Sequence, residues 1–401
     1  VVGTYTANGV RTRPGLVFVR GEGSWLFDDA DDKYLDMASG IAVSVLGHAD
    51  PEWVAAIADQ AGRVAHTSNL FHNFPSTTLA EKLVATSGFD KVFLCNSGTE
   101  ANEAALKFAY KFRQAAVGMP ATPEFSCLSD SSSFHGRSMG ALAMTHKPAI
   151  RYPFAPLPHD VTFLPFNDAD AVRQMFEAHP GGIDAVIVEP VQGEAGVFPA
   201  TEDFLGAIRE QCTKHSAVMI CDEVQCGLGR TGELWAHERY GVEPDVVTAA
   251  KPLAGGIPIG ATLLTDRIAD VVAPGDHGTT FGGNPIACAA ANVVLDRISA
   301  PDFLPAVVDK GHALKGYLSE ALGPGVLAVR QSGLLAGIQM ADGAAAAAVT
   351  QKALARGVVA ITAGVGVVRL APPLNISGAD LEHGATVVAE CAREVGAGGL
   401  E

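Results

Sequence analysis

Short apolar runs alternate with helix-forming stretches through the middle of the chain. Five of these runs contain no charged residue and lie at Val92–Cys95, Ala185–Val188, Val218–Cys221, Val246–Ala249 and Ala261–Leu264. Continuous apolar strands are typical of parallel sheets that helices cover on both faces. The pattern therefore predicts an α/β fold built on a parallel sheet.

The two ends of the chain follow other patterns. The N-terminal part predicts short strands at Leu16–Arg20, Trp25–Phe27 and Tyr34–Asp36, separated by Gly and Asp turns. The C-terminal part predicts helices over Ile286–Ser299 and Phe303–Leu322, then strands at Leu335–Met340 and Val367–Leu370. We expect a large domain over residues 51–285, a smaller α+β domain over residues 286–401, and an N-terminal segment, residues 1–50, that packs with the smaller domain.

Composition excludes several classes of partner. Lys and Arg total 28 and Asp and Glu total 44, so the net charge of −16 argues against nucleic acid and anionic membrane surfaces. No apolar run approaches the ~20 residues that span a bilayer. Charged residues make up only 18% of the chain, which suggests surface hidden in an oligomer. The seven cysteines form no CxxC pair and indicate reduced thiols, and we expect no metal site.

Polar residues follow several of the apolar runs at the point where each run ends. Asn96 and Ser97 follow one run, and Glu189, Asp222 and Lys251 follow, or nearly follow, three others. Ligands of open parallel sheets bind beyond the carboxyl ends of the strands. This edge of the sheet is therefore the candidate site.

The segment Ser97-Gly98-Thr99-Glu100 predicts the start of a helix. A serine followed three residues later by a glutamate has the form of a capping box. Gly98 lets the backbone approach a ligand closely, and the free N–H groups of a first turn favour an anion. Taken alone, the segment fits a capped helix without a ligand equally well.

Asp222 and Lys251 are separated by about one strand–helix–strand unit, so both can reach the same edge of the sheet. A carboxylate and an amine suit a cofactor that has a basic ring nitrogen and an aldehyde, because the lysine can form a Schiff base. A structural ion pair, or a lysine that only binds phosphate, would explain two isolated residues as well.

The stretch Gly227–Gly232 matches the GxGxxG pattern of dinucleotide-binding proteins. In that motif the first glycine directly follows its strand and the last opens a helix. Here residues 222–226 intervene and the sequence that follows is short and polar. We therefore reject a nicotinamide site.

Eight segments, in the order in which the family has them, identify a resemblance to the class III, or ornithine-type, aminotransferases of the fold-type-I pyridoxal-phosphate enzymes. They are SGIAV (39–43), FLCNSGTEANEAALKF (93–108), FHGRSMGALAMT (134–145), VEPVQGEAGV (188–197), CDEVQCGLGRTG (221–232), KPLAGGIPIGA (251–261), GDHGTTFGGNP (275–285) and VRLAPPLNIS (368–377). The resemblance covers nearly the whole chain and implies a large domain with a mostly parallel sheet plus a smaller α+β domain.

The resemblance assigns roles around pyridoxal 5'-phosphate. Lys251 would bind the aldehyde and carry a proton during catalysis, and Asp222 would pair with the ring nitrogen. The other cofactor ligands would be Ser97, Gly98 and Thr99 at the phosphate, Phe134 and Val224 on the ring faces, Gln225 at the ring hydroxyl, and Thr280 from the neighbouring subunit of a homodimer.

Substrate recognition would depend on two arginines. Arg137 would bind a substrate carboxylate, and Arg369 the α-carboxylate of 2-oxoglutarate or L-glutamate. Glu194 would act as the switch that pairs with Arg369 when the amino donor binds. Thr279 would lie beside the substrate, across the dimer interface.

The resemblance implies transfer of the 5-amino group of N2-acetyl-L-ornithine to 2-oxoglutarate, a step in arginine biosynthesis. Ornithine-specific members have a tyrosine where this chain has Ile41, which favours an acylated donor. Ornithine, succinylornithine and 4-aminobutyrate are the alternative donors. We expect a plastid or mitochondrial matrix location after removal of a transit peptide if the source is eukaryotic, and the cytoplasm if it is bacterial.

Overall fold

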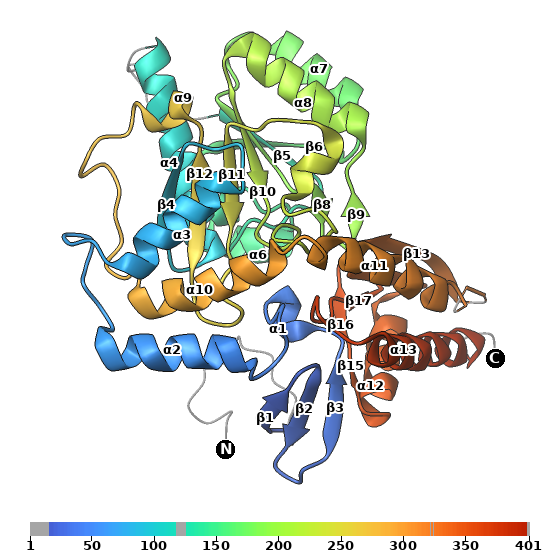
Figure 1. The fold of residues 1–401 in the computed structure, drawn as a ribbon. Helices are drawn as coiled ribbons and strands as arrows, with labels where there is room; N and C mark the ends of the chain where they lie inside the picture. Colours follow the sequence, from blue (N-terminus) through green and yellow to red (C-terminus); the bar gives the residue numbers. More distant parts are fainter. Residues whose placement is uncertain (1–15, 118–125, 321, 324, 399–401) are drawn as a thin grey trace.

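The computed structural model describes residues 16–117, 126–320, 322, 323 and 325–398, and its centre is a sheet of seven strands (Figure 1). The strands lie in the order β4 (Lys91–Cys95), β12 (Gly260–Leu264), β11 (Val246–Ala249), β10 (Val218–Asp222), β7 (Ala185–Val188), β5 (Ser126–Asp130) and β6 (Asp160–Leu164). All five apolar runs are therefore strands of one sheet.

One strand of this sheet runs against its neighbours. β12 pairs antiparallel with both β11 and β4, whereas the pairs from β11 to β6 are parallel. A parallel crossover takes a dozen or more residues and is usually helical, but only residues 250–259, without a helix, join β11 to β12. The prediction of a parallel run at Ala261–Leu264 is wrong for this reason, and the sheet is mostly parallel.

Helices cover both faces of the sheet, as the apolar runs predicted. Alternate residues of the strands, such as Ile220 and Met219, belong to two separate apolar clusters. The cluster that contains Ile220 also contains Ala104 and Phe108 of α4 (Gly98–Val117). The cluster that contains Met219 also contains Phe204 of α8 (Glu202–His215). The remaining helices of this part are α2 (Pro51–Arg63), α3 (Phe74–Ala85), α5 (Met139–Ala143), α6 (Pro148–Arg151), α7 (Ala169–Ala178), α9 (Asp266–Ala269) and α10 (Pro285–Ile298).

The C-terminal part forms an antiparallel sheet with helices packed on it. Its strands lie in the order β13 (Val326–Ser332), β14 (Leu335–Met340), β17 (Val367–Leu370) and β16 (Ile361–Ala363). Its helices are α11 (Phe303–Ser319), α12 (Gly343–Ala355) and α13 (Gly378–Gly398), which lie together in Figure 1.

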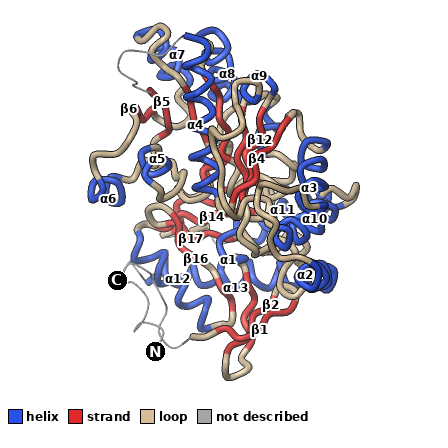
Figure 2. The backbone as a smooth tube through the Cα atoms, turned by 90° about the vertical axis from the view of Figure 1, so that its left-hand side faces the viewer, coloured by secondary structure: helices blue, strands red, loops and turns tan. Residues whose placement is uncertain are grey.

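The N-terminal strands lie beside this C-terminal part (Figure 2). β1 (Phe18–Glu22), β2 (Trp25–Asp28) and β3 (Lys33–Asp36) are followed by the short α1 (Ser39–Ala42), and β15 (Val358–Val359) pairs parallel with β3. A two-stranded ribbon of β8 (Val191–Gln192) and β9 (Phe198–Pro199) completes the strands described. The three domain boundaries stay a prediction. No helix in the described ranges is both long and apolar enough to cross a bilayer.

Candidate active site

A cavity of about 300 Å³ opens at the carboxyl ends of β4, β7 and β10. Its lining residues come from six separate segments and are Ser97, Gly98, Thr99, Asn102, Phe134, His135, Gly136, Arg137, Glu189, Glu194, Asp222, Val224, Gln225 and Lys251. Ten of the thirteen residues predicted for the site therefore line one cavity; Arg369, Thr279 and Thr280 do not.

The first turn of α4 forms one wall of the cavity. The Ser97 hydroxyl accepts a hydrogen bond from the Glu100 amide (3.2 Å), as a helix cap requires. The Glu100 carboxylate accepts from the amide of Asn96 (2.7 Å), so the reciprocal bond of the predicted capping box goes to Asn96 and not to Ser97. A Cβ atom at Gly98 would lie 2.6 Å from Val224 Cγ1, so only glycine allows this approach.

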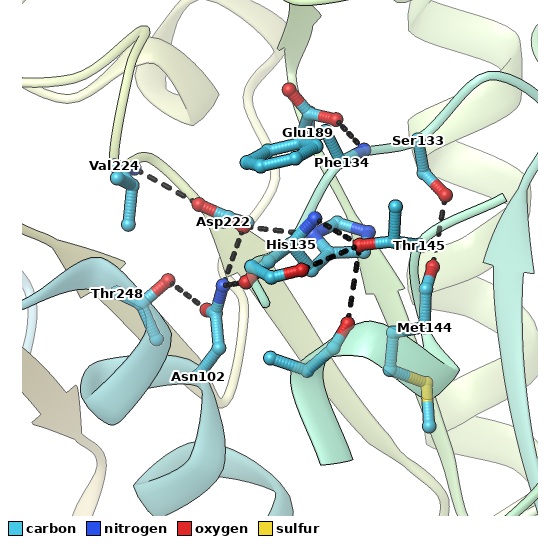
Figure 3. A network of polar contacts seen from close by, with 12 residues as sticks. Asn102, Ser133, Phe134, His135, Met144, Thr145, Glu189, Asp222, Val224 and Thr248 are labelled. Carbon is cyan, nitrogen blue, oxygen red and sulfur yellow. Dashed lines mark hydrogen bonds and ion pairs between the residues drawn. The ribbon is translucent and has the colours of Figure 1, made fainter. Parts of the chain in front are cut away.

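Asp222 ends β10 and is held by three hydrogen-bond donors (Figure 3). Its Oδ2 lies 2.8 Å from Asn102 Nδ2 and 2.7 Å from His135 Nδ1, and its Oδ1 accepts from the Val224 amide at 3.0 Å. The residue is only 3% exposed. These three contacts fix the orientation of the buried carboxyl group. Asp222 is therefore placed to pair with a cation in the cavity.

Lys251 follows β11 and brings the amine to the same cavity. It makes no hydrogen bond or ion pair with the residues that the structure describes. Burial, and then the positive charge of Arg369, lower the pKa of Lys251 to about 8, against the opposing effects of Glu194, Glu189 and Asp222. An amine with this pKa is partly deprotonated near neutral pH and can act as a nucleophile or a base.

Glu189, directly after β7, is a buried acid whose role sequence reasoning missed. Burial raises the pKa of Glu189 to about 8, and the nearby His135 opposes this rise. One of its oxygens accepts a hydrogen bond from the Phe134 amide (2.9 Å; Figure 3). It thereby fixes the segment that presents the Phe134 ring to the cavity. The position after an apolar run was visible in the sequence, but the bond to residue 134 was not.

Arg369 lies in β17 and is 2% exposed. It does not line the cavity itself but contacts Glu194 and Gln225, which do. Its Nη1 donates to Glu194 Oε2 (2.9 Å), to the carbonyl of Gly193 (2.9 Å) and to Gln225 Oε1 (3.1 Å). The Glu194 side chain is 45% exposed, unlike the arginine. The buried cation is fixed and its carboxylate partner stands at the solvent edge, where it can move.

One cationic and one aromatic side chain lie together at the mouth of the cavity. The exposed guanidinium of Arg137 lies 5.7 Å from the centre of the half-buried Phe134 ring. The loop that carries both is tied to α4, because the Thr99 and Ser138 hydroxyls are 2.6 Å apart. The cavity thus offers a free guanidinium next to an aromatic face.

Thr279 and Thr280 lie outside this chain's cavity. The Thr279 hydroxyl accepts from Asn96 Nδ2 (2.8 Å), and Thr280 is exposed. Both belong to the loop between α9 and α10, which borders a separate hollow of about 460 Å³. The expectation that they serve a neighbouring subunit stays a prediction.

The GxGxxG stretch Gly227–Gly232 forms a buried loop and not the start of a helix. The helical turn that follows, Ala236–Tyr240, is a short 3₁₀ helix. Arg230 within the loop donates to the carbonyls of Leu334 (3.0 Å) and Pro372 (2.6 Å). The stretch therefore contacts the C-terminal part and lacks the strand–turn–helix geometry of the dinucleotide motif.

A larger hollow, of about 800 Å³, lies away from these residues. Asp245, one of the two acids that line it, is paired with Arg209 (3.1 Å) and Arg267 (2.5 Å). The smaller cavity holds both the buried carboxyl group of Asp222 and the amine of Lys251, so it is the better candidate for chemistry.

The donor set of the smaller cavity fits a phosphorylated pyridine aldehyde. A helix N-terminus with a glycine that cannot be replaced suits the phosphate, the buried Asp222 carboxylate suits the ring nitrogen, and the Lys251 amine suits the aldehyde. Comparison with known proteins agrees with this fit. Residues 5–391 match the family model described as aminotransferase class III.

Individual relatives are similar along most of their length. The chain is 48% identical to the mitochondrial acetylornithine aminotransferase of Alnus glutinosa, over 98% of this chain and 85% of that protein. Among solved structures, an N-acetylornithine aminotransferase from Stenotrophomonas maltophilia is 36% identical with a TM-score of 0.81, over 94% of this chain and 96% of that one. The ornithine aminotransferase of Toxoplasma gondii is 28% identical with a TM-score of 0.92, over 98% and 93%. The chain therefore belongs to the class III aminotransferases, a family of pyridoxal-phosphate-dependent transaminases.

Proposed function

We propose that this enzyme transfers the 5-amino group of N2-acetyl-L-ornithine to 2-oxoglutarate, giving N-acetyl-L-glutamate 5-semialdehyde and L-glutamate. The observation that carries the proposal is the Arg369–Glu194 pair (2.9 Å) next to the cavity that holds Lys251 and Asp222. A buried arginine with a movable counter-charge accepts a dicarboxylate when Glu194 swings away, and is neutralised when the amino donor binds.

The cofactor would be held by residues on all sides of the cavity. Ser97, Gly98 and Thr99 would bind its phosphate, Asp222 would keep its ring nitrogen protonated, and Gln225 would contact the ring hydroxyl, while Phe134 and Val224 would cover the two ring faces. When bound, pyridoxal phosphate supplies an electron sink that stabilises the negative charge left on the amino carbon after loss of a proton.

Lys251 would first hold the cofactor and then act as the base. Its lowered pKa lets it remove a proton from the amino carbon near neutral pH and return it to the cofactor side of the bond. The three hydrogen bonds to the buried Asp222 would keep its carboxyl group facing the ring nitrogen through both steps.

Two arginines would recognise the substrates. Arg369 would bind the α-carboxylate of 2-oxoglutarate or L-glutamate, and Arg137, which is exposed at the mouth, would bind the carboxylate of the acylated donor. Ile41, 46% exposed in α1, offers no hydroxyl to a free α-ammonium group, which favours the acetylated donor.

A homodimer would complete the site. Phe71 (72% exposed) lines the hollow beside Thr279 and Thr280, and Leu70 (84%), Phe74 (91%) and Phe281 (60%), which are next to its lining residues in sequence, are exposed as well. Burying them against a second copy would be favourable and would bring Thr280 to the partner's phosphate site and Thr279 to its substrate. Mixing Lys251→Ala subunits with Thr280→Ala subunits tests this, because one intact shared site should restore part of the activity.

Steady-state kinetics would decide the amino donor. We expect the highest kcat/KM with acetylornithine among acetylornithine, ornithine, succinylornithine and 4-aminobutyrate, each with 2-oxoglutarate. A preference for free ornithine would contradict the argument from Ile41. Lys251→Ala should lose both turnover and the visible absorption of the attached cofactor, and an active, coloured variant would refute the role of Lys251.

The compartment is the remaining part of the proposal. The relative from Alnus glutinosa is a mitochondrial acetylornithine aminotransferase, which supports an organellar matrix. Localisation of a fluorescent fusion in the source cells is the direct measurement.

A further inference from the structure

A chain of buried polar side chains links three elements behind the cavity (Figure 3). The Thr248 hydroxyl in β11 donates to Asn102 Oδ1 (2.7 Å), and Asn102 Nδ2 donates to Asp222 Oδ2 (2.8 Å) and to the carbonyl of His135 (2.7 Å). Thr248, Asn102 and Asp222 are 0%, 1% and 3% exposed. Water cannot replace any of these bonds without rearrangement of the core.

The Asn102 amide has only one acceptable orientation in this chain. An ionised carboxylate and a carbonyl both accept hydrogen bonds, so the NH₂ group must face Asp222 and His135. The opposite orientation would bring three acceptor oxygens together, those of Asn102, Asp222 and the His135 carbonyl. The two acceptors therefore set the amide, and the Thr248 hydroxyl supports this orientation by donating to Asn102 Oδ1.

Asn102 also joins two parts of the site that are far apart in sequence. It donates to Asp222, the residue that would face the ring nitrogen, and to the carbonyl of His135 in the loop that presents Phe134. The helix face that does this also carries Thr99, which holds Ser138 of the same loop. The i, i+3 spacing of residues 99 and 102 places both on one side of α4.

We propose that Asn102 is a positioning residue for transamination, which keeps the Asp222 carboxyl group aimed at the cofactor's ring nitrogen. The inference rests on the proposed function and adds a residue to it. A neutral amide donor serves here because it gives two N–H groups without a competing negative charge. An aspartate of the same shape would offer an acceptor instead, and the two carboxyl groups would share a proton.

The charged groups that already surround this contact are untouched by the substitutions that test it. His135 faces Asp222 from the loop after β5, and Glu189 and Lys251 face the cavity from the ends of β7 and β11. Asn102→Asp replaces the amide by a carboxyl group of almost the same volume. A shared proton on Asp222 would weaken its hold on the proton of the ring nitrogen.

The test compares Asn102→Asp with a matched control, Asn292→Asp. Asn292 is a half-buried asparagine in α10 that donates to the carbonyl of Pro75 (2.9 Å), far from the cavity in sequence and outside its lining. The measurements on the cofactor-loaded enzymes are kcat, KM and the ¹⁵N NMR shift of ring-labelled pyridoxal phosphate. The cofactor dissociation constant is measured as well.

We expect Asn102→Asp to lower kcat by about 10- to 100-fold with KM changed much less, because one charge-assisted bond is lost at the reacting cofactor. The ¹⁵N shift should move toward the unprotonated ring, and Asn292→Asp should leave kcat and the shift as in the parent. If Asn102→Asp does not fold, Thr248→Val provides a second test. It removes the hydrogen bond to Asn102 Oδ1 and should give a smaller loss of kcat, with the ¹⁵N shift moved in the same direction.

An Asn102→Asp enzyme with parental kcat and parental ¹⁵N shift would overturn the inference, as would equal losses in both aspartate variants. A folded Thr248→Val enzyme with parental values would overturn it too. A parent protein that transaminates none of the four donors would instead overturn the proposed function, so the two failures are distinguishable.

Discussion

The cofactor-free protein is expected to become more stable at neutral pH when Lys251 is replaced by methionine. Lys251 is partly buried in a cavity where burial, and then Arg369, lower its pKa from 10.5 to about 8. At pH 7 the amine is protonated in both the folded and the unfolded chain. The free energy of unfolding is therefore lowered by the cost of burying the charged amine next to Arg369.

The size of the effect follows from the difference in pKa. A fall from 10.5 to about 8 corresponds to roughly 3 kcal/mol, and solvent at the partly exposed side chain reduces this to about 1–3 kcal/mol. The cost is complete below pH 8, shrinks as the folded amine loses its proton, and vanishes above pH 10.5, where both states are neutral. Methionine keeps most of the side-chain volume without the charge.

Urea unfolding of the cofactor-free parent and variant at pH 7, 9 and 10.5 is the assay. The midpoint of Lys251→Met should exceed that of the parent at pH 7, and the gap should close as the pH rises. Lys214→Met, on the exposed side of α8, is the control and should differ from its parent by less than about 0.5 kcal/mol. A variant that is no more stable at pH 7, or a gap independent of pH, would refute the reasoning.

Three further outcomes are expected. Gly98→Ala would place a Cβ atom 2.6 Å from Val224 Cγ1, so the cofactor should bind at least ~10-fold more weakly in an equilibrium titration, and parental affinity would contradict the close approach. Glu194→Gln removes the counter-charge of Arg369 and should lower KM for 2-oxoglutarate in steady-state kinetics; a raised KM would count against the switch. Phe204→Ala, at a fully buried position, should lower the free energy of unfolding by about 3–5 kcal/mol in urea, and a loss under 1 kcal/mol would show that the core there repacks.

The sequence was sufficient for the strands that are apolar throughout and insufficient for the others. β7 and β11 begin and end where the apolar runs do, whereas β5 and β6 were not predicted. β5 reads Ser-Cys-Leu-Ser-Asp, and its buried Ser129 has a partner that only the fold supplies, the Met144 carbonyl. A one-dimensional pattern does not contain those partners.

The sequence also predicted some residues of the candidate site and not others. Asp222 and Lys251 were predicted because each follows a strand, which is a local signal. Asn102 and His135 were missed as site residues, and the role of Glu189 was missed, because their contacts join positions 33 to 120 residues apart. Their importance depends on which atoms face one another, and that is fixed only when the chain has folded.

The guanidinium of Arg230 bears on how such an enzyme can change its substrate. Arg230 lies in the loop after Asp222 and donates to two carbonyls of the C-terminal part, those of Leu334 and of Pro372, the latter just after the strand of Arg369. A tilt between the two parts that widened the space for a bulkier donor would have to break these buried bonds. We therefore expect new specificities on this scaffold to arise by exchange of side chains at the rim, which leaves the reacting atoms in register.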